Sequence, residues 1–139
     1  MMLNNKIKNR LSTEHIAYCA GLFDGEGCVQ YKLYPRKYAS GNMGKVWALT
    51  MEINMTEIEP LHYFLNVVKH GTVTYKKNYG LGKKDQWRWR VSHRKAFAVA
   101  QMIYPYSIVK RPKLLMIINH YALDKPTSIL EEKAKFSKF

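Results

Sequence analysis

The sequence has few cysteines. Only two, Cys19 and Cys28, occur in 139 residues. Two cysteines cannot form the set of disulfides on which small secreted domains depend. Neither a CxxC pair nor a zinc-like histidine spacing is present. We therefore expect both cysteines to be small packing residues, and we expect a hydrophobic core to hold the chain together.

Long apolar segments are also missing. No run approaches the roughly 20 apolar residues that a bilayer-spanning helix needs. The opening stretch, MMLNNKIKNRLSTEH, lacks the apolar segment of a signal peptide. These features predict a soluble, intracellular protein, and they do not distinguish cytoplasm, nucleoid and organelle matrix.

Acidic residues are scarce relative to basic ones. Ten Asp and Glu face 23 Lys and Arg, which gives a formal net charge of +13. A hydrophobic content of 47% and an aromatic content of 13% argue for a folded chain. So basic a folded protein favours a polyanionic partner, with nucleic acid ahead of membrane. Charge alone leaves open a basic protein that is merely soluble.

The hydrophobic periodicity predicts one α+β domain over residues 1–139, with a core at about 12–123 and a basic tail at 124–139. We expect a four-stranded antiparallel sheet with helices on one face. The start should be a loose arm, and Ser12 or Thr13 should cap the first helix. Thr56 should cap the second helix. The expected helices are at 13–24, 57–69, 95–103 and from about 110 or 112 to 123, with a further short helix after Pro126. The expected strands are at 28–36, 45–54, 72–77 and 86–92, with an arm at 1–11 and a loop at 35–44.

One face of this predicted sheet is polar and cationic. A two-stranded ribbon fits the major groove of DNA, and side chains of this kind read base edges there. An ordinary solvated sheet face is the alternative. The candidate DNA-binding residues, on the strands and the adjoining basic loop, are Gln30, Lys32, Tyr34, Arg36, Lys37, Thr50, Glu52, Thr74, Lys76, Arg88 and Arg90.

The first helix carries a stripe of small residues. Ala17, Ala20, Gly21 and Asp24 follow helical spacing and share one face. The apolar flank of Ile16, Cys19, Leu22 and Phe23 can anchor the helix in its own core. A small-residue face allows two helix backbones to approach closely. Because the chain has no second such helix, we expect an identical helix across a two-fold axis, and hence a homodimer.

Glu26 follows directly where the two helices would converge. Two Glu26 carboxylates brought together at helix C-termini repel each other, and the helix dipole adds to this cost. The arrangement is favourable if a divalent cation lies between them, because Mg²⁺ takes one or two carboxylates plus water and phosphate oxygens. Next to a phosphodiester, such a cation activates water. The alternative is that Asp24 and Glu26 only mark the end of a helix.

Residues 19–27, CAGLFDGEG, resemble the nine-residue signature of LAGLIDADG homing endonucleases. Ala20, Gly21, Leu22, Asp24 and Gly27 match outright, Glu26 takes the final acidic position, and Cys19 replaces the leading Leu. The predicted order of elements also fits this family over about residues 12–123. The resemblance implies a saddle-shaped sheet in the major groove, paired motif helices, and cleavage of a long, pseudo-palindromic site in double-stranded DNA.

The resemblance also implies roles for single residues. Glu26 would be the essential ligand of Mg²⁺, or of another divalent cation such as Mn²⁺, with the Gly25 carbonyl nearby. Asp24 would be structural at the helix–helix interface. Lys110, the basic residue after the helix-breaking Pro105, would stabilise charge on the scissile phosphate. Many relatives carry a solvent-positioning Gln where this chain has Asn54 and Met55, so that role is unassigned.

Two other functions fit parts of this pattern. A non-catalytic maturase that binds intron RNA or DNA can use the same fold, since fold alone does not fix function. Glu26 favours the enzyme, because a pure binder has no need of carboxylates facing phosphates. A basic ribosome-associated protein would leave the small-residue helix face unexplained. The sequence does not reveal the target DNA, the host intron or intein, or the organism.

Overall fold

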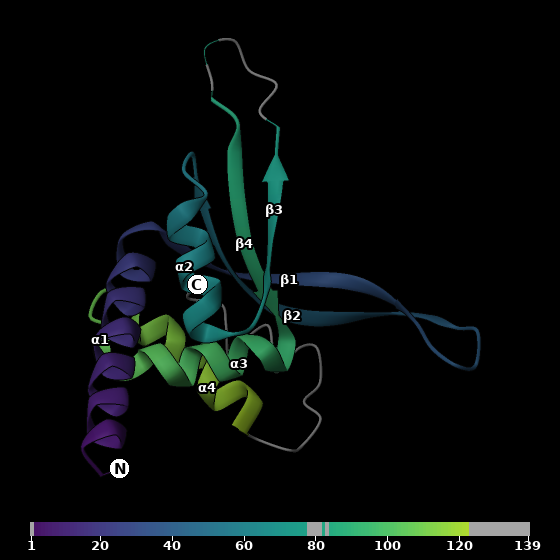
Figure 1. Cartoon of the computed structure of the whole chain (residues 1–139). Helices are drawn as coiled ribbons and strands as arrows, with labels where there is room; N and C mark the ends of the chain where they lie inside the picture. Colours follow the sequence, from purple (N-terminus) through teal and green to yellow (C-terminus); the bar gives the residue numbers. More distant parts are fainter. Residues whose placement is uncertain (1, 78–81, 83, 123–139) are drawn as a thin grey trace.

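The computed structural model describes residues 2–77, 82 and 84–122, with side chains from residue 13 onward. The tail after residue 122, with its expected short helix, lies outside the described residues. Figure 1 shows the helices gathered together, with two β-hairpins projecting away from them in different directions. The elements in chain order are α1 (Met2–Glu26), β1 (Gly27–Lys37), β2 (Met43–Met55), α2 (Glu59–Val68), β3 (Thr72–Lys76), β4 (Gln86–Ser92), α3 (His93–Ile103), the 3-10 turn η1 (Tyr104–Tyr106) and α4 (Arg111–Ala122).

The four strands form one antiparallel sheet in the order β1-β2-β4-β3. The two hairpins therefore join through β2 and β4, where Met51 pairs with Val91 and Ile53 with Trp89. This confirms the expected four-stranded antiparallel sheet. The predicted bounds of β4 agree with those observed, because its alternation of Trp87, Trp89 and Val91 with arginines is unbroken.

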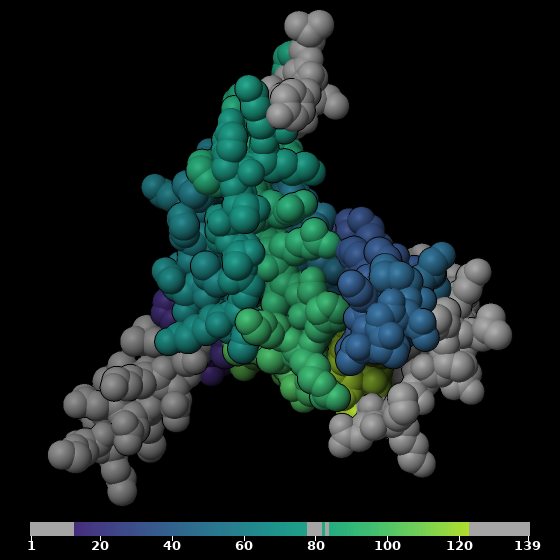
Figure 2. All heavy atoms as spheres, turned by 90° about the vertical axis from the view of Figure 1, so that its right-hand side faces the viewer, coloured from purple at the N-terminus to yellow at the C-terminus, as the bar shows by residue number. Residues whose placement is uncertain are grey.

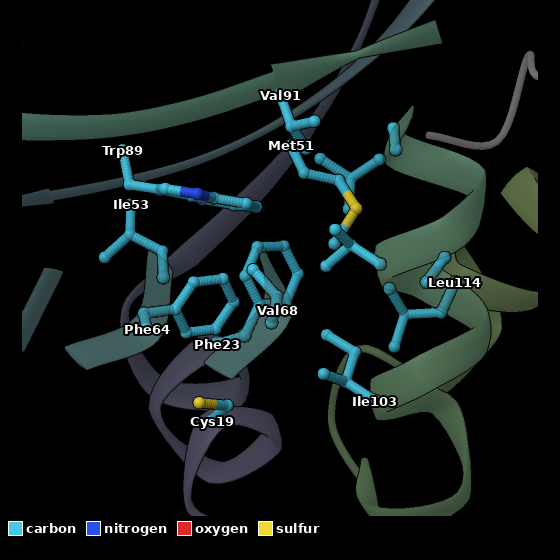
Figure 3. Close-up of a cluster of buried hydrophobic side chains, with 14 of the residues drawn as sticks. Cys19, Phe23, Met51, Ile53, Phe64, Val68, Trp89, Val91, Ile103 and Leu114 are labelled. Atoms are coloured by element: carbon cyan, nitrogen blue, oxygen red, sulfur yellow. The ribbon is translucent and has the colours of Figure 1, made fainter. Parts of the chain in front are cut away.

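The helices pack on one face of the sheet and enclose a single apolar cluster. Figure 3 shows Trp89, Met51, Ile53 and Val91 above side chains from all four helices. Trp89 is fully buried and stacks edge-on against Phe64 of α2, with ring centroids 4.5 Å apart. Its indole N–H donates to the carbonyl of His70 at 2.9 Å, so the one polar atom of the ring is satisfied.

The β1–β2 hairpin is longer than the sequence indicated. Its strands extend to Lys37 and resume at Met43, which leaves a loop of only 38–42 instead of 35–44. Pro35 is tolerated inside a strand because β1 is an edge strand, where a missing N–H need not break a ladder. Beyond the helices the core side of the hairpin is uncovered, so Leu33 is 37% exposed and Met43 68% exposed.

Two expected helix starts are wrong. Residues 2–11, predicted as a loose arm, continue α1 without a break, because they contain neither glycine nor proline. Thr13 therefore lies inside the helix and is not its N-cap. The second helix begins at Glu59 after Ile58, without a side-chain cap, so Thr56 does not cap it either. Pro60 in the first turn defines that start instead.

Among the described residues, no helix combines the length and the apolar character that crossing a membrane requires.

Candidate active site and nucleic-acid interface

The junction of α1 and β1 is tight, and Gly27 makes it possible. A Cβ at Gly27 would lie 2.5 Å from the backbone oxygen of Phe23 and 2.3 Å from the Phe23 ring. Because the ring is fully buried in the core, neither atom can move aside cheaply. The helix can therefore pass directly into the strand only with glycine here, which fixes where Glu26 leaves the helix.

Asp24 is bound by a loop of its own chain. Its Oδ2 accepts the backbone N–H of Ile108 at 2.7 Å, and its Oδ1 accepts that of Lys110 at 3.0 Å. The buried Ser107 hydroxyl also donates to Oδ1. Partial burial opposes ionisation of this carboxyl, but the donors from 107–110 outweigh it and lower the pKa of Asp24.

Asp24 thus has a structural role within its own chain, where its carboxylate holds the segment before α4. Sequence reasoning missed Ser107, because the contact joins residues 83 apart along the chain. No local pattern around Ser107 indicates it.

Glu26, two residues later, has the opposite surroundings. It is exposed, and within the described part of the chain it makes no hydrogen bond or ion pair. It is the last residue of α1, where the final carbonyls, including that of Gly25, have no partner within the helix. This helix end therefore offers a free carboxylate and free carbonyl oxygens, the donor set that Mg²⁺ and similar hard cations prefer.

One chain does not complete such a metal site. Among the described residues, no group of three or more His, Cys, Asp or Glu side chains comes together. Mg²⁺ sites tolerate this, since water and substrate phosphates supply the remaining oxygens. The residues present therefore fit a cation held by Glu26 and the Gly25 carbonyl, shared with a second carboxylate or with DNA.

Lys110 lies beside this helix end. Its backbone N–H is one of the three donors to Asp24, and its carbonyl accepts from Leu114 at the start of α4. The side chain is half-buried. Two fixed points therefore hold the backbone of Lys110 near the helix end that carries Glu26.

The exposed face of α1 differs from the expected stripe. Ala20 is fully buried in the core of its own chain beside Cys19 and Phe23, so it is not available to a partner helix. Ala17 and Asp24 are half-buried, and Gly21 and Gly25 are exposed. A Cβ at Gly21 or Gly25 would meet nothing within 4 Å among the described residues, so this part of the chain does not itself require glycine there.

One of the two cysteines also differs from expectation. Cys19 is buried, as predicted, and burial raises the pKa of its thiol to about 12. Cys28 is exposed and therefore does not pack in the core. Strand alternation places Cys28 on the polar face, opposite Glu52.

The register brings most of the candidate DNA-binding residues onto one sheet face. Residues directly opposite each other in paired strands lie on the same side. Glu52 is opposite Arg90, and Arg90 is opposite Thr72. Figure 2 shows the side of the molecule toward which the β1–β2 hairpin, in blue, projects. The candidates that share this face are Gln30, Lys32, Tyr34, Arg36, Thr50, Glu52, Thr74, Lys76, Arg88 and Arg90.

Two candidates are placed differently. Lys37 alternates to the other side of β1, opposite Met43, although it is exposed near the hairpin tip. Thr50 is on the polar face but is fully buried, and its hydroxyl is 3.4 Å from that of Ser92. Thr50 therefore cannot touch DNA in this conformation. Arg36, also near the hairpin tip, is exposed, and its guanidinium lies 5.7 Å from the centre of the Tyr38 ring.

A hydrogen-bonded cluster occupies the middle of the polar face. Glu52, only 8% exposed, accepts from the side-chain amides of Gln30 at 3.2 Å and Asn54 at 3.3 Å. Arg90 donates to the Tyr34 hydroxyl at 2.9 Å. Sequence reasoning connects Asn54 only with solvent positioning, because strand alternation predicts which face a side chain occupies but not which neighbour it hydrogen-bonds.

Comparison with known proteins identifies the fold. No protein-family model matches the sequence, and no curated protein matches it significantly. Solved structures do match. The homing endonuclease I-CvuI, in complex with its target in the presence of Ca, superimposes with a TM-score of 0.64 at 19% identity, over 78% of this chain and 66% of that one. This chain therefore spans just under two thirds of the length of I-CvuI.

Two further structures agree. The homing endonuclease I-TnaI gives a TM-score of 0.57 at 17% identity, over 75% of this chain and 69% of that one. The LAGLIDADG meganuclease I-AabMI, bound to uncleaved DNA, gives 0.57 at 17% identity, over 86% of this chain and 38% of that one. The chain thus has the fold of LAGLIDADG homing endonucleases, as the motif predicted.

Proposed function

We propose that the chain is a homodimeric, site-specific endonuclease that hydrolyses phosphodiester bonds in double-stranded DNA with the help of a divalent cation. The observation that carries this proposal is the contrast at the end of α1. One carboxylate, Asp24, is bound by three donors of its own chain, and the next, Glu26, is left exposed without a partner. The fold shared with DNA-bound homing endonucleases supports the same conclusion.

The dimer interface is proposed at Gly21 and Gly25, with Ala17 beside them. Their exposed positions are one helical turn apart and have open space above them, which allows another α1 helix to approach closely. A two-fold axis at this face brings two copies of Glu26 toward each other. It also gives the target approximate two-fold symmetry.

The metal site is proposed at this axis. Glu26 and the Gly25 carbonyl of each subunit would hold Mg²⁺, or Mn²⁺ in its place. When bound, such a cation activates water and stabilises charge on the phosphate oxygens. Glu26 orients the cation, and Lys110 contributes a positive charge toward the scissile phosphate. The Asp24 carboxylate keeps the backbone of Lys110 in place.

The sheet is proposed to bind the major groove. Its polar face carries exposed Lys32, Lys76 and Thr74 around the half-buried Arg88 and Arg90. Lysines on the margins suit phosphate contacts, which supply affinity, and arginines nearer the centre suit base contacts, which supply specificity. The net charge of +13 favours association with DNA before any base is read.

The test uses the full chain and a randomised duplex DNA library. Duplexes retained in Ca²⁺ are sequenced, and the enriched duplex is then incubated with the protein in Mg²⁺ or in EDTA. We expect a symmetric enriched site that is cut on both strands in Mg²⁺ and left intact in EDTA. Enrichment without cutting would contradict the nuclease activity and favour the maturase-like alternative. A parallel selection from RNA measures whether the protein prefers intron RNA.

A further inference from the structure

Two polar atoms on the sheet face are buried without a partner. They are Oδ1 of Asn54, an acceptor, and Nε of Arg88, a donor, and neither has a hydrogen-bond partner within the described part of the chain. Asn54 and Arg88 are direct cross-strand neighbours on β2 and β4. Buried polar atoms cost free energy when they are left unsatisfied. An acceptor and a donor thus lie on adjacent residues, each lacking what the other offers.

The orientation of the Asn54 amide is set by Glu52. An ionised carboxylate only accepts hydrogen bonds, so the Asn54 atom 3.3 Å from Glu52 Oε1 must be the NH₂ group. The amide oxygen is then the atom left over for Arg88. The Gln30 amide donates to the same Glu52 oxygen at 3.2 Å and holds the carboxylate from the other side.

Arg90 on the same strand is held by a different group. One of its terminal nitrogens donates to the Tyr34 hydroxyl at 2.9 Å, so part of its guanidinium is already engaged by its own chain. Within the described part of the chain Arg88 makes no such contact, so both of its terminal nitrogens are available there. A guanidinium held through Nε presents these two nitrogens as a fork, the geometry that pairs with O6 and N7 of guanine.

We propose that Glu52 and Asn54 are positioning residues that aim Arg88 at a guanine. On DNA binding, Arg88 Nε donates to Asn54 Oδ1, and its terminal nitrogens pair with one guanine in each half-site. Gln30 completes the arrangement by holding Glu52. This inference rests on the proposed DNA-binding function and assigns specificity within that same surface.

The test repeats the selection from randomised duplex DNA in Ca²⁺ with single variants of the full chain. Arg88→Ala should reduce the preference for guanine about tenfold at one symmetric pair of positions. Asn54→Leu, which has a similar shape but no acceptor, should weaken the preference at the same pair of positions. Arg90→Ala is the matched control and should act at a different pair. Thermal unfolding of each variant checks that it folds.

A double variant separates positioning from simple packing. Glu52→Gln combined with Asn54→Asp exchanges the two groups, so that the new amide donates to the new carboxylate. The acceptor facing Arg88 and the net charge are both kept. We expect the guanine preference lost in Asn54→Leu to be largely restored in this variant. A role in fold stability alone would not produce restoration at one pair of base positions.

The outcomes distinguish this inference from the proposed function. If the wild type enriches a site but Asn54→Leu leaves the guanine preference intact, or weakens all positions equally, the positioning role is wrong and DNA binding stands. If the wild type enriches no site, the proposed function fails, and this inference fails with it.

Discussion

The two sides of the end of α1 differ in what their carboxylates contact. On the Asp24 side, three donors from 107–110 surround the carboxylate and connect the helix to the segment before α4. On the Glu26 side, the carboxylate is exposed and unpartnered among the described residues. Both lie at a helix C-terminus, where the dipole disfavours negative charge.

This difference marks Asp24 as a structural carboxylate, and it is the basis on which we propose Glu26 as the metal ligand. The unfavourable position of Asp24 is offset by its hydrogen bonds, so the folded chain itself explains the residue. Nothing within the described chain offsets the position of Glu26. The same reasoning applies to the glycines, because Gly27 is required by the Phe23 contact, whereas Gly21 is required by nothing in its own chain.

The largest expected effect follows from filling the exposed face of α1. Gly21→Leu should abolish dimerisation and DNA cleavage, because a side chain there separates the two helices. The monomer should remain folded and gain up to about 1 kcal/mol in its free energy of unfolding, since leucine favours a helix more than glycine does and a Cβ at this position meets no other part of the described chain within 4 Å. Light scattering measures the dimer, and Gln101→Leu on the exposed side of α3 is the control. A dimer of unchanged mass would contradict the interface.

A smaller loss of cleavage is expected when Lys110, whose backbone N–H is bound by Asp24, is replaced. Lys110→Ala should slow cleavage about 100-fold, the loss typical of one group that stabilises transition-state charge, with little change in binding. Single-turnover cleavage and DNA affinity are measured together. Lys95→Ala removes an equal charge from an exposed site on α3 as a control. Equal effects of the two variants on cleavage would show that Lys110 acts only through net charge.

Of the two carboxylates at the end of α1, Asp24 should contribute more to the free energy of unfolding than Glu26 does. Asp24→Ala should lower the free energy of unfolding by about 1.5–3 kcal/mol, because it leaves three donors without their charged acceptor. Glu26→Ala, at the same helix end, should change it by less than about 0.5 kcal/mol. Urea denaturation compares the two variants. Similar losses in both would remove the distinction between these carboxylates.

The smallest effect is a pH dependence. Because the pKa of Asp24 lies below its usual value of 3.8, the ionised carboxylate stabilises the fold. This contribution of Asp24 to the free energy of unfolding is complete above the pKa that its carboxyl has in the unfolded chain. It is lost as the pH falls through the lower pKa of the same carboxyl in the folded chain. The stability difference between wild type and Asp24→Asn should therefore be constant above about pH 5 and shrink below about pH 4. A difference that grows on acidification would contradict this sign.

The fold was predictable where patterns are local. Strand alternation gave the bounds of β4 and the polar and apolar faces, because side chains alternate strictly along a strand. The start of α1 was not predictable, because Thr13 resembles an N-cap but the residues before it also favour a helix. Ala20 was assigned to the wrong face because it lies at the border between the core stripe and the small-residue stripe, and helical spacing alone does not divide them.

The candidate site was predictable only in part. The motif placed Asp24, Gly25 and Glu26 at a helix end, and the structure agrees. The partners of Asp24 come from residues 107–110, and such distant contacts leave no local pattern. The burial of Thr50 also depends on its position between Gln30 and Ser92 in the folded sheet, and the alternation of a single strand does not reveal such cross-strand neighbours.

The most direct test of the central claim compares Glu26→Gln with Glu57→Gln on the DNA site enriched by the wild type. Glu57 is also exposed, so each variant loses one surface carboxylate. We predict that Glu26→Gln binds the site at least as tightly as the wild type. Its Mg²⁺-dependent cleavage should fall by more than about 100-fold, because loss of a residue that only supports a metal ligand already costs up to about that much. Glu57→Gln should cut normally. Wild-type cleavage by Glu26→Gln would contradict the assignment of Glu26 as the metal ligand.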